Sequence, residues 1–253
     1  MADAVDEVRY ERRGAAALVT IDRPARRNAI DGKTADALVE ALESFEADDE
    51  ARAMVLTGAG AAFCAGADLT AIDTLEPRAR RGEGPLGFTR RVATKPTIAA
   101  IDGWAVAGGL ELAVWCDVRI GSPRAQFGCL ERRFGVPLID GGTWRLPRIV
   151  GFGRAMEMVL TGRVVAAEEA LAIGLVTAVV DDPVTHALAM AEQLATYPQE
   201  TMLSDRNSMY DGWGHTLEEA LAIEARYGSE VLLVGRAGAA RFAGGEGRSA
   251  QGV

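Results

Sequence analysis

The sequence predicts an α/β fold in which a sheet-containing core is followed by a helical C-terminal part. Up to Asp140, short apolar runs typical of strands alternate with segments of helical spacing. Beyond Asp140, helical spacing dominates. Hydrophobic residues make up 49% of the 253 residues, which is enough to bury a sizeable core.

The predicted strands are short and lie in the first half of the chain. Gly14 separates the first two, which therefore form a hairpin, and Gly58 and Gly60 close the third. The strand segments are Val5–Tyr10, Ala15–Ile21, Ala53–Thr57, Thr97–Ile101 and Val118–Ile120. Helical segments between them give the strand, helix, strand order of a parallel sheet.

The predicted helices follow from apolar residues at helical spacing, and Asp31 or Thr34 can cap the first of them. The helical segments are Thr34–Glu46, Gly108–Trp115, Gly142–Val150, Arg154–Leu160, Ala167–Ile173, Val184–Thr196 and Leu217–Leu233. Residues 73–87 mix Gly and Pro with charges, which predicts a mobile surface loop. The tail after Gly235 is rich in Gly and Ala and is predicted to be loosely held.

Composition argues against several classes of function. A formal net charge of −9 argues against a nucleic-acid-binding protein, because phosphates need a basic surface. The acidic N-terminus and the lack of any run of about eighteen apolar residues predict a cytoplasmic protein that does not cross a membrane. Three distant cysteines and two histidines give little support to a disulfide framework, a metal site or a serine triad. A catalytic acid or base is therefore expected to be a carboxylate.

Arginines are clustered at several places in this acidic chain. One cluster is Arg23, Arg26 and Arg27, and others lie at residues 78–81 and 90–91. Such a cluster can form a restricted anion site, or its members can be separately solvated.

Two stretches of small residues can turn the backbone tightly and present bare amides to a ligand. The first is FCAGADL, Phe63–Leu69, after a predicted strand. The second, Trp104–Asp117, places Gly108 and Gly109 at the start of a helix, where unpaired N–H groups favour an oxyanion. Glycines before helices are also common in ordinary turns.

Three carboxylates near these stretches are candidate acids or bases. Glu111 interrupts an otherwise apolar helix, where burial is costly unless the group is partnered or used; alternatively it is a first-turn residue favoured by the helix dipole. Glu131 is either an acid or base of the site or a partner of Arg132 or Arg133 in an exposed ion pair. Asp140 can simply cap the next helix.

Together, five separated motifs in one order resemble the crotonase (enoyl-CoA hydratase/isomerase) superfamily. They are RPARRNAI (23–30), FCAGADL (63–69), KPTIAAIDGWAVAGGLELAVWCD (95–117), QFGCLERRFGVPLIDGGTWRL (126–146) and AMEMVLTGR (155–163). The resemblance implies a spiral of ββα turns with a helical C-terminal trimerisation region, and a homotrimer or homohexamer. It also implies an acyl-CoA-binding core over residues 1–195 and a helical region over 196–253.

The resemblance implies roles for individual residues. Ala67 and Gly108 look like the oxyanion hole for the thioester oxygen, and Glu111 and Glu131 like the catalytic glutamates of a hydratase. Coenzyme A would be carried as part of the acyl-CoA substrate, with no metal or other cofactor. The residues that the resemblance places against coenzyme A are Arg27, Ala65, Asp68 and Leu69.

The sequence departs from common hydratases at three places. Asp140, in Leu138–Gly142, puts an extra acid where they have a Pro-Gly-Ala-Gly-Gly-like stretch. Thr70 stands where some hydratases have a Lys that reaches a phosphate of the substrate. The C-terminal tail lacks the basic, aromatic ending often seen in family members that degrade fatty acids. The predicted function is hydration of a 2-enoyl-CoA. The alternatives are an enoyl- or dienoyl-CoA isomerase that uses Asp140 as an additional acid, and a non-catalytic acyl-CoA-binding paralogue.

Overall fold

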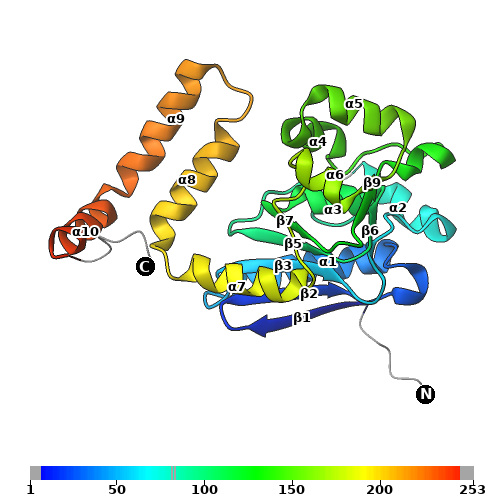
Figure 1. Cartoon of the computed structure of the whole chain (residues 1–253), viewed down its shortest axis with the longest axis horizontal. Helices are drawn as coiled ribbons and strands as arrows, with labels where there is room; N and C mark the ends of the chain where they lie inside the picture. Colours follow the sequence, from blue (N-terminus) through cyan, green and yellow to red (C-terminus); the bar gives the residue numbers. More distant parts are fainter. Residues whose placement is uncertain (1–6, 81, 83, 246–253) are drawn as a thin grey trace. The chain divides into compact units, whose positions relative to one another are not determined.

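A computed structural model describes residues 7–80, 82 and 84–245 of the chain (Figure 1). The chain divides into two compact units, Met1–Glu192 and Gln193–Val253. The first unit contains both sheets, and the second is helical. The helices within the described ranges are too short or too polar to span a lipid bilayer.

The larger sheet of the first unit has six strands in the order β1-β2-β3-β5-β7-β10. Its strands are β1 (Val8–Arg13), β2 (Ala16–Ile21), β3 (Ala53–Gly58), β5 (Thr97–Ile101), β7 (Val118–Gly121) and β10 (Ala178–Val179). In this sheet only β1 and β2 pair antiparallel, which confirms the predicted hairpin around Gly14. Every residue of β2 and β5 is buried, as expected for strands covered on both faces.

A smaller sheet has the order β4-β6-β8-β9, with only β9 antiparallel. Its strands are β4 (Ala62–Cys64), β6 (Trp104–Val106), β8 (Gln126–Gly128) and β9 (Val165–Ala166). The chain passes from β3 to β4, from β5 to β6 and from β7 to β8, each time adding a strand to both sheets before a helical segment. This repeat confirms the predicted spiral of ββα turns.

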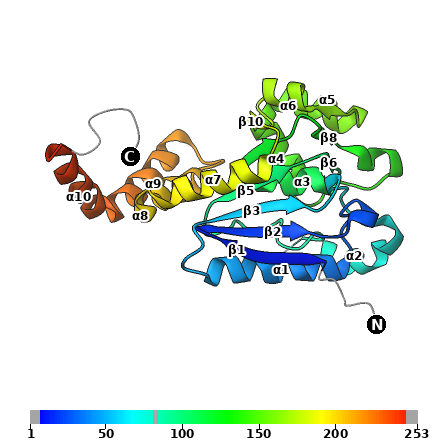
Figure 2. The same ribbon diagram turned by 60° about the horizontal axis from the view of Figure 1, so that its bottom comes forward.

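Helices cover the sheets of the first unit, and Figure 2 shows α1 against the strands β1 and β2. The helices are α1 (Gly32–Ala47), α2 (Ile72–Ala79), α3 (Gly108–Trp115), α4 (Gly142–Val150), α5 (Phe152–Thr161), α6 (Ala167–Ala172) and α7 (Pro183–Ala195). Short 3-10 helices are η1 (Pro24–Arg26), η2 (Leu69–Ala71) and η3 (Leu130–Phe134). Asp31 caps α1 by accepting a hydrogen bond from the Thr34 amide at 2.9 Å, as predicted.

The prediction of a mobile loop over residues 73–87 is wrong in its first half, where α2 forms. Leu75 and Arg78 are buried on α2, and Arg78 forms an ion pair with Asp36 of α1. The Thr74 hydroxyl accepts a hydrogen bond from the Gly32 amide at 2.9 Å. These tertiary contacts outweigh the helix-breaking tendency of Pro77. Residues 81 and 83 lie outside the described residues.

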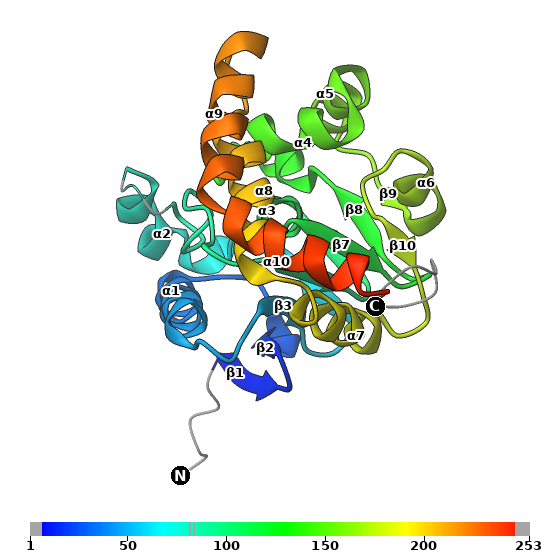
Figure 3. The ribbon, with the colours of Figure 1, turned by 90° about the vertical axis from the view of Figure 1, so that its left-hand side faces the viewer.

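After the end of α7, the described residues of the second unit form α8 (Gln199–Asp211), α9 (Leu217–Glu230) and α10 (Leu232–Ala243). Figure 3 shows α8 and α9 side by side, as Figure 1 does. No helix was predicted over α8, and the single helix predicted over Leu217–Leu233 is two helices that meet at Val231. The tail was predicted to be loose after Gly235, but it is helical through Ala243. Its role in trimerisation stays a prediction, and residues 246–253 lie outside the described residues.

Candidate active site

A mainly apolar cavity of about 430 Å³ lies in the first unit. Its walls come from the turn after β4, from α2, from the junction of β6 and α3, and from the segment that joins η3 to α4. It brings together residues that the sequence singled out at separate places, namely Ala65, Ala67, Leu69, Gly108, Glu111, Glu131 and Asp140. Arg27 and Asp68 are not among its lining residues.

The two small-residue turns meet backbone to backbone at this cavity. Gly66 has a φ of 89°, a conformation that a side chain rarely tolerates. A Cβ added to Gly66 would lie 2.7 Å from the Gly108 nitrogen. Only a glycine therefore lets the first turn approach the start of α3 this closely.

The amide of Ala67 takes no part in the backbone pairing around it. Ile30 pairs with Ala67, but the bonds run from the Ile30 amide to the Gly66 carbonyl at 2.8 Å and from the Asp68 amide to the Ile30 carbonyl at 2.7 Å. A parallel bridge of this kind uses the carbonyl of the residue before Ala67 and the N–H of the residue after it. The Ala67 N–H therefore lies outside this ladder, in a residue that lines the cavity.

The second turn is strained at a residue that sequence reasoning missed. Ala107 has φ 53° and ψ −128°, an unusual conformation for a residue with a Cβ, and it is held by a hydrogen bond from its amide to the Gly128 carbonyl at 2.9 Å. It reverses the chain from β6 into α3, so that Gly108 is the first helical residue. The N–H groups of a first helical turn have no acceptor within the helix. No local sequence signal marks Ala107 as strained.

Glu111 is 3% exposed and lies directly against the start of α4. Its Oε1 accepts hydrogen bonds from the Asp140 amide at 2.9 Å and from the Gly142 amide at 2.8 Å. Burial, and then repulsion from the Asp140 carboxylate, raise the pKa of Glu111 to about 8 despite these two bonds. The glutamate is thus buried and partnered by backbone, and its protonation state responds to a neighbouring acid.

Glu131 is 5% exposed, and both of its carboxyl oxygens are buried without a hydrogen-bond partner among the described residues. Burial raises its pKa. Arg132 and Arg133 donate instead to the carbonyls of Val159 and Gly162. The alternative of an exposed ion pair is therefore wrong, and an unpartnered buried carboxyl group is costly unless it is used.

The prediction that Asp140 caps α4 is wrong. Gly141, with a φ of 97°, is the N-cap residue, and Glu111 supplies the carboxylate there. The Asp140 Oδ1 instead accepts hydrogen bonds from the Leu86 amide at 3.1 Å and from the Thr89 hydroxyl. Burial raises the pKa of Asp140, which is 3% exposed.

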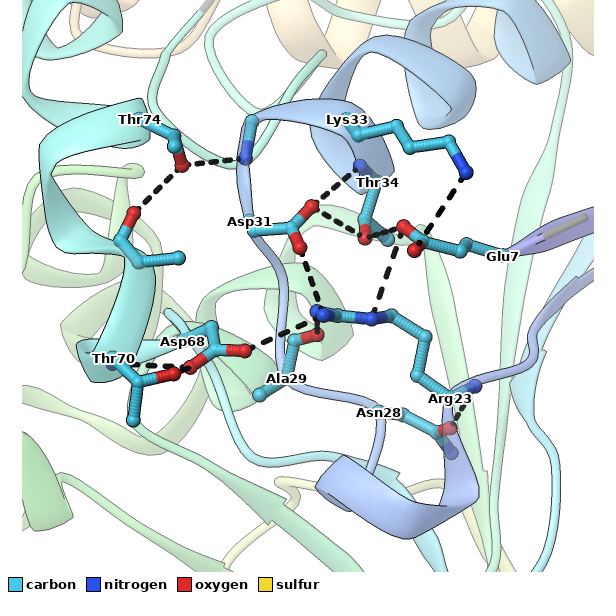
Figure 4. Close-up of polar contacts among 12 residues, drawn as sticks. Glu7, Arg23, Asn28, Ala29, Asp31, Lys33, Thr34, Asp68, Thr70 and Thr74 are labelled. Carbon is cyan, nitrogen blue, oxygen red and sulfur yellow. Dashed lines mark hydrogen bonds and ion pairs between the residues drawn. The ribbon is translucent and has the colours of Figure 1, made fainter.

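Arg23 lies in a cluster of carboxylates beside the first turn (Figure 4). Its guanidinium is 2.8 Å from Asp31, 3.4 Å from Asp68 and 3.8 Å from Glu7. Asp68 also accepts hydrogen bonds from the amide and hydroxyl of Thr70. Arg23 and Asp68 therefore tie the chain before α1 to the chain after Ala67, and the charge of Arg23 is balanced within the protein.

Arg26 and Arg27, in contrast, are exposed. Arg27 ends η1 in the left-handed conformation, with a φ of 52°. Its carbonyl accepts a hydrogen bond from the Ala65 amide at 3.0 Å. The backbone of Arg27 thus adjoins a residue that lines the cavity.

The raised pKa of Glu111 predicts a pH-dependent cost to stability. Between its ordinary value of 4.5 and about 8, the unfolded chain releases a proton that the folded chain keeps, so stability falls as the pH rises across this window. Replacing Glu111→Gln removes this cost. The change that this substitution makes in the free energy of unfolding is therefore expected to be about 1–4 kcal/mol more favourable at pH 8 than at pH 4.5. Urea unfolding of both proteins at the two pH values measures the difference. Parallel stability profiles would contradict it.

The fold and this site define a class of protein, an enzyme of the crotonase superfamily that combines backbone amides with buried carboxyl groups. A family profile described as enoyl-CoA hydratase/isomerase matches residues 11–242. The chain belongs to this family.

Similar proteins are named as enoyl-CoA hydratases. The chain is 41% identical over 199 residues to a probable enoyl-CoA hydratase, EchA14 of Mycobacterium tuberculosis, covering 76% of this chain and 77% of that protein. It is 36% identical to the short-chain-enoyl-CoA hydratase of Clostridium acetobutylicum, covering 87% of each. The crystal structure of enoyl-CoA hydratase EchA1 from Mycobacterium marinum superposes with a TM-score of 0.89 at 33% identity, covering 94% of this chain and 96% of that one.

Proposed function

We propose that the protein is an enoyl-CoA hydratase, which adds water reversibly across the double bond of a 2-enoyl-CoA thioester. One observation carries the proposal: Glu111 and Glu131 are both buried and both line one apolar cavity, beside two backbone turns. An apolar cavity suits an acyl chain, and paired carboxyl groups suit the transfer of protons. The hydratase names of the relatives support the same reaction.

The amides of Ala67 and Gly108 would hold the thioester oxygen. When water adds to the β-carbon, negative charge moves onto this oxygen as the thioester becomes an enolate. Amides fixed in a cavity that excludes water stabilise such charge by several kcal/mol. The close approach of Gly66 to Gly108 supports a common target for the two N–H groups.

The two glutamates have different surroundings, which suits opposite roles. Two amides donate to Oε1 of Glu111 and orient its carboxyl group, and its raised pKa of about 8 makes the ionised form a stronger base than an ordinary carboxylate, so this form would take a proton from water as the water oxygen bonds to the β-carbon. Glu131 has no hydrogen-bond partner among the described residues, and burial raises its pKa, so its protonated form would deliver its proton to the α-carbon. One water is consumed, and its second proton ends on the new hydroxyl group. The isomerase alternative loses support because Asp140 is held by Leu86 and Thr89.

A turnover screen tests this function. The purified protein is mixed with enoyl-CoA thioesters of short, long, branched and aromatic acyl groups, and the ultraviolet absorbance of the conjugated thioester is followed. We expect the absorbance to fall for at least one class as the double bond is hydrated. Binding of every thioester without any fall would support the non-catalytic alternative instead.

Arg27 would meet a phosphate of coenzyme A, because it is exposed beside the cavity on an acidic protein. Arg27→Ala is expected to raise the acyl-CoA KM about tenfold and to weaken its dependence on salt, with kcat nearly unchanged. Steady-state kinetics at two salt concentrations measure both effects, and Arg154→Ala, an exposed arginine on α5, is the control. A KM unchanged by Arg27→Ala would remove this residue from the binding site.

Coenzyme A, carried as part of the substrate, would be the only cofactor. The working assembly would be a homotrimer or a homohexamer. Support for assembly comes from leucines of α9 and α10 that are more than half exposed, namely Leu217, Leu221, Leu232 and Leu233. Sedimentation analysis distinguishes these assemblies from a monomer.

A further inference from the structure

Asp140 is a buried acid that the proposed mechanism does not use, and it contacts three separate parts of the site. Its carboxylate binds the 84–89 segment, through the Leu86 amide and the Thr89 hydroxyl. Its own amide donates to Oε1 of Glu111 on α3 at 2.9 Å. Its carbonyl accepts from Arg145 of α4 at 3.1 Å.

The segment held by Asp140 forms a wall of the cavity next to the predicted oxyanion site. Leu86 is buried and lines the cavity. A Cβ added to Gly108 would overlap the Leu86 Cδ1, so this side chain lies directly against Gly108. Leu86 therefore covers the start of α3 with an apolar group.

The 84–89 segment packs closely against the Asp140 carboxylate and is also held by Arg145. Gly84 has a φ of 97°, and a Cβ added there would lie 2.9 Å from the Asp140 Oδ1, so the backbone passes directly over the carboxylate. Arg145 bridges the same two parts, since it donates to the Thr89 carbonyl at 2.8 Å as well as to the Asp140 carbonyl. The segment is thus fixed to the residue that also positions Glu111.

We infer that Asp140 is a positioning residue for hydration, whose carboxylate anchors the 84–89 segment so that Leu86 stays against Gly108 while the Asp140 amide holds Glu111. This inference rests on the proposed function. An apolar cover keeps water away from the oxyanion site, and hydrogen bonds to a developing charge are stronger where water is excluded.

Two substitutions at Asp140 separate anchoring from proton transfer. Asp140→Asn keeps an oxygen that can accept from Leu86 and Thr89, whereas Asp140→Ala keeps neither bond. We expect Asp140→Ala to lower kcat about 10²-fold, more than it changes KM, because a misplacement of about 1 Å costs that much. We expect Asp140→Asn to restore most of the lost kcat. Equal losses in the two variants would overturn the inference, because the carboxyl group would then be needed for its charge or its proton.

Hydrogen exchange of the Leu86 amide gives a second test that does not depend on turnover. We expect faster exchange in Asp140→Ala than in the wild-type protein, and near wild-type exchange in Asp140→Asn. Thr89→Val removes one of the two bonds at nearly constant volume and is expected to speed exchange to an intermediate degree, which keeps the test informative if Asp140→Ala fails to fold. Unchanged exchange in Asp140→Ala, or in Thr89→Val if only that variant folds, would overturn the anchor. A wild-type protein that hydrates no enoyl-CoA would overturn the proposed function, while the exchange data would still decide whether the anchor exists.

Discussion

Replacing Glu131→Gln is expected to lower kcat for hydration by about 10²–10⁴-fold, the usual contribution of one well-placed acid or base. Gln has almost the same shape but cannot deliver a proton to the α-carbon. Glu111→Gln is expected to cost a similar factor, since Gln can still accept from the Asp140 and Gly142 amides but cannot take a proton from water. Steady-state hydration kinetics measure both losses.

Glu76 offers a matched control for these two variants. It also lines the cavity, but it is exposed on α2. Glu76→Gln removes one negative charge from the same cavity and is expected to leave kcat within about threefold of the wild-type value, because it takes no part in proton transfer. A Glu131→Gln protein that keeps full activity would exclude Glu131 as the proton donor.

Gly66→Ala is expected to lower kcat/KM by about 10²–10³-fold, the usual cost of losing one oxyanion-hole donor. The new Cβ would lie 2.7 Å from the Gly108 nitrogen, and the φ of 89° adds strain, so the two turns have to move apart. The Ala67 and Gly108 amides would then no longer share one target. Hydration kinetics measure the loss, and circular dichroism shows whether the fold survives.

Gly153→Ala is the control for this substitution. Gly153 lies on α5, where an added Cβ meets no atom within 4 Å. Alanine also favours a helix, so stability should not fall and activity should not change. If Gly66→Ala folds and keeps wild-type activity, the meeting of the two turns is not what stabilises the enolate.

Much of the fold followed from local patterns, because its central strands are buried on both faces and appear as continuous apolar runs. Thr97–Ile101 and the helix Gly108–Trp115 have the bounds that the sequence predicted. α2 was missed because its stability comes from the distant contacts of Arg78 and Thr74, which no local pattern records. α8 was missed because its sequence is mostly polar and lacks a clear apolar stripe.

The residues of the candidate site were likewise predicted where a local pattern or motif marks them, and misassigned where distant contacts decide their role. Glu111 stood out because a carboxylate within an apolar helix is unusual, and Glu131 because of its place in a motif. Asp140 was misassigned because helix-cap rules consider neighbours in the sequence, whereas its partners Leu86 and Thr89 are 54 and 51 residues away. In the same way, Arg23 was grouped with Arg26 and Arg27 by proximity, although its ion pairs with Asp31 and Asp68 form only in the folded chain.

Transfer of an oxygen atom from solvent to product tests the central claim most directly. The wild-type protein is incubated with a 2-enoyl-CoA that it consumes, in water enriched in oxygen-18, and the product is analysed by mass spectrometry. If Glu111 and Glu131 add water across the double bond, the 3-hydroxyacyl product carries one oxygen-18 atom in its new hydroxyl group. A product with the mass of the starting thioester, a shifted double bond and no oxygen-18 would contradict hydration and identify the enzyme as an isomerase.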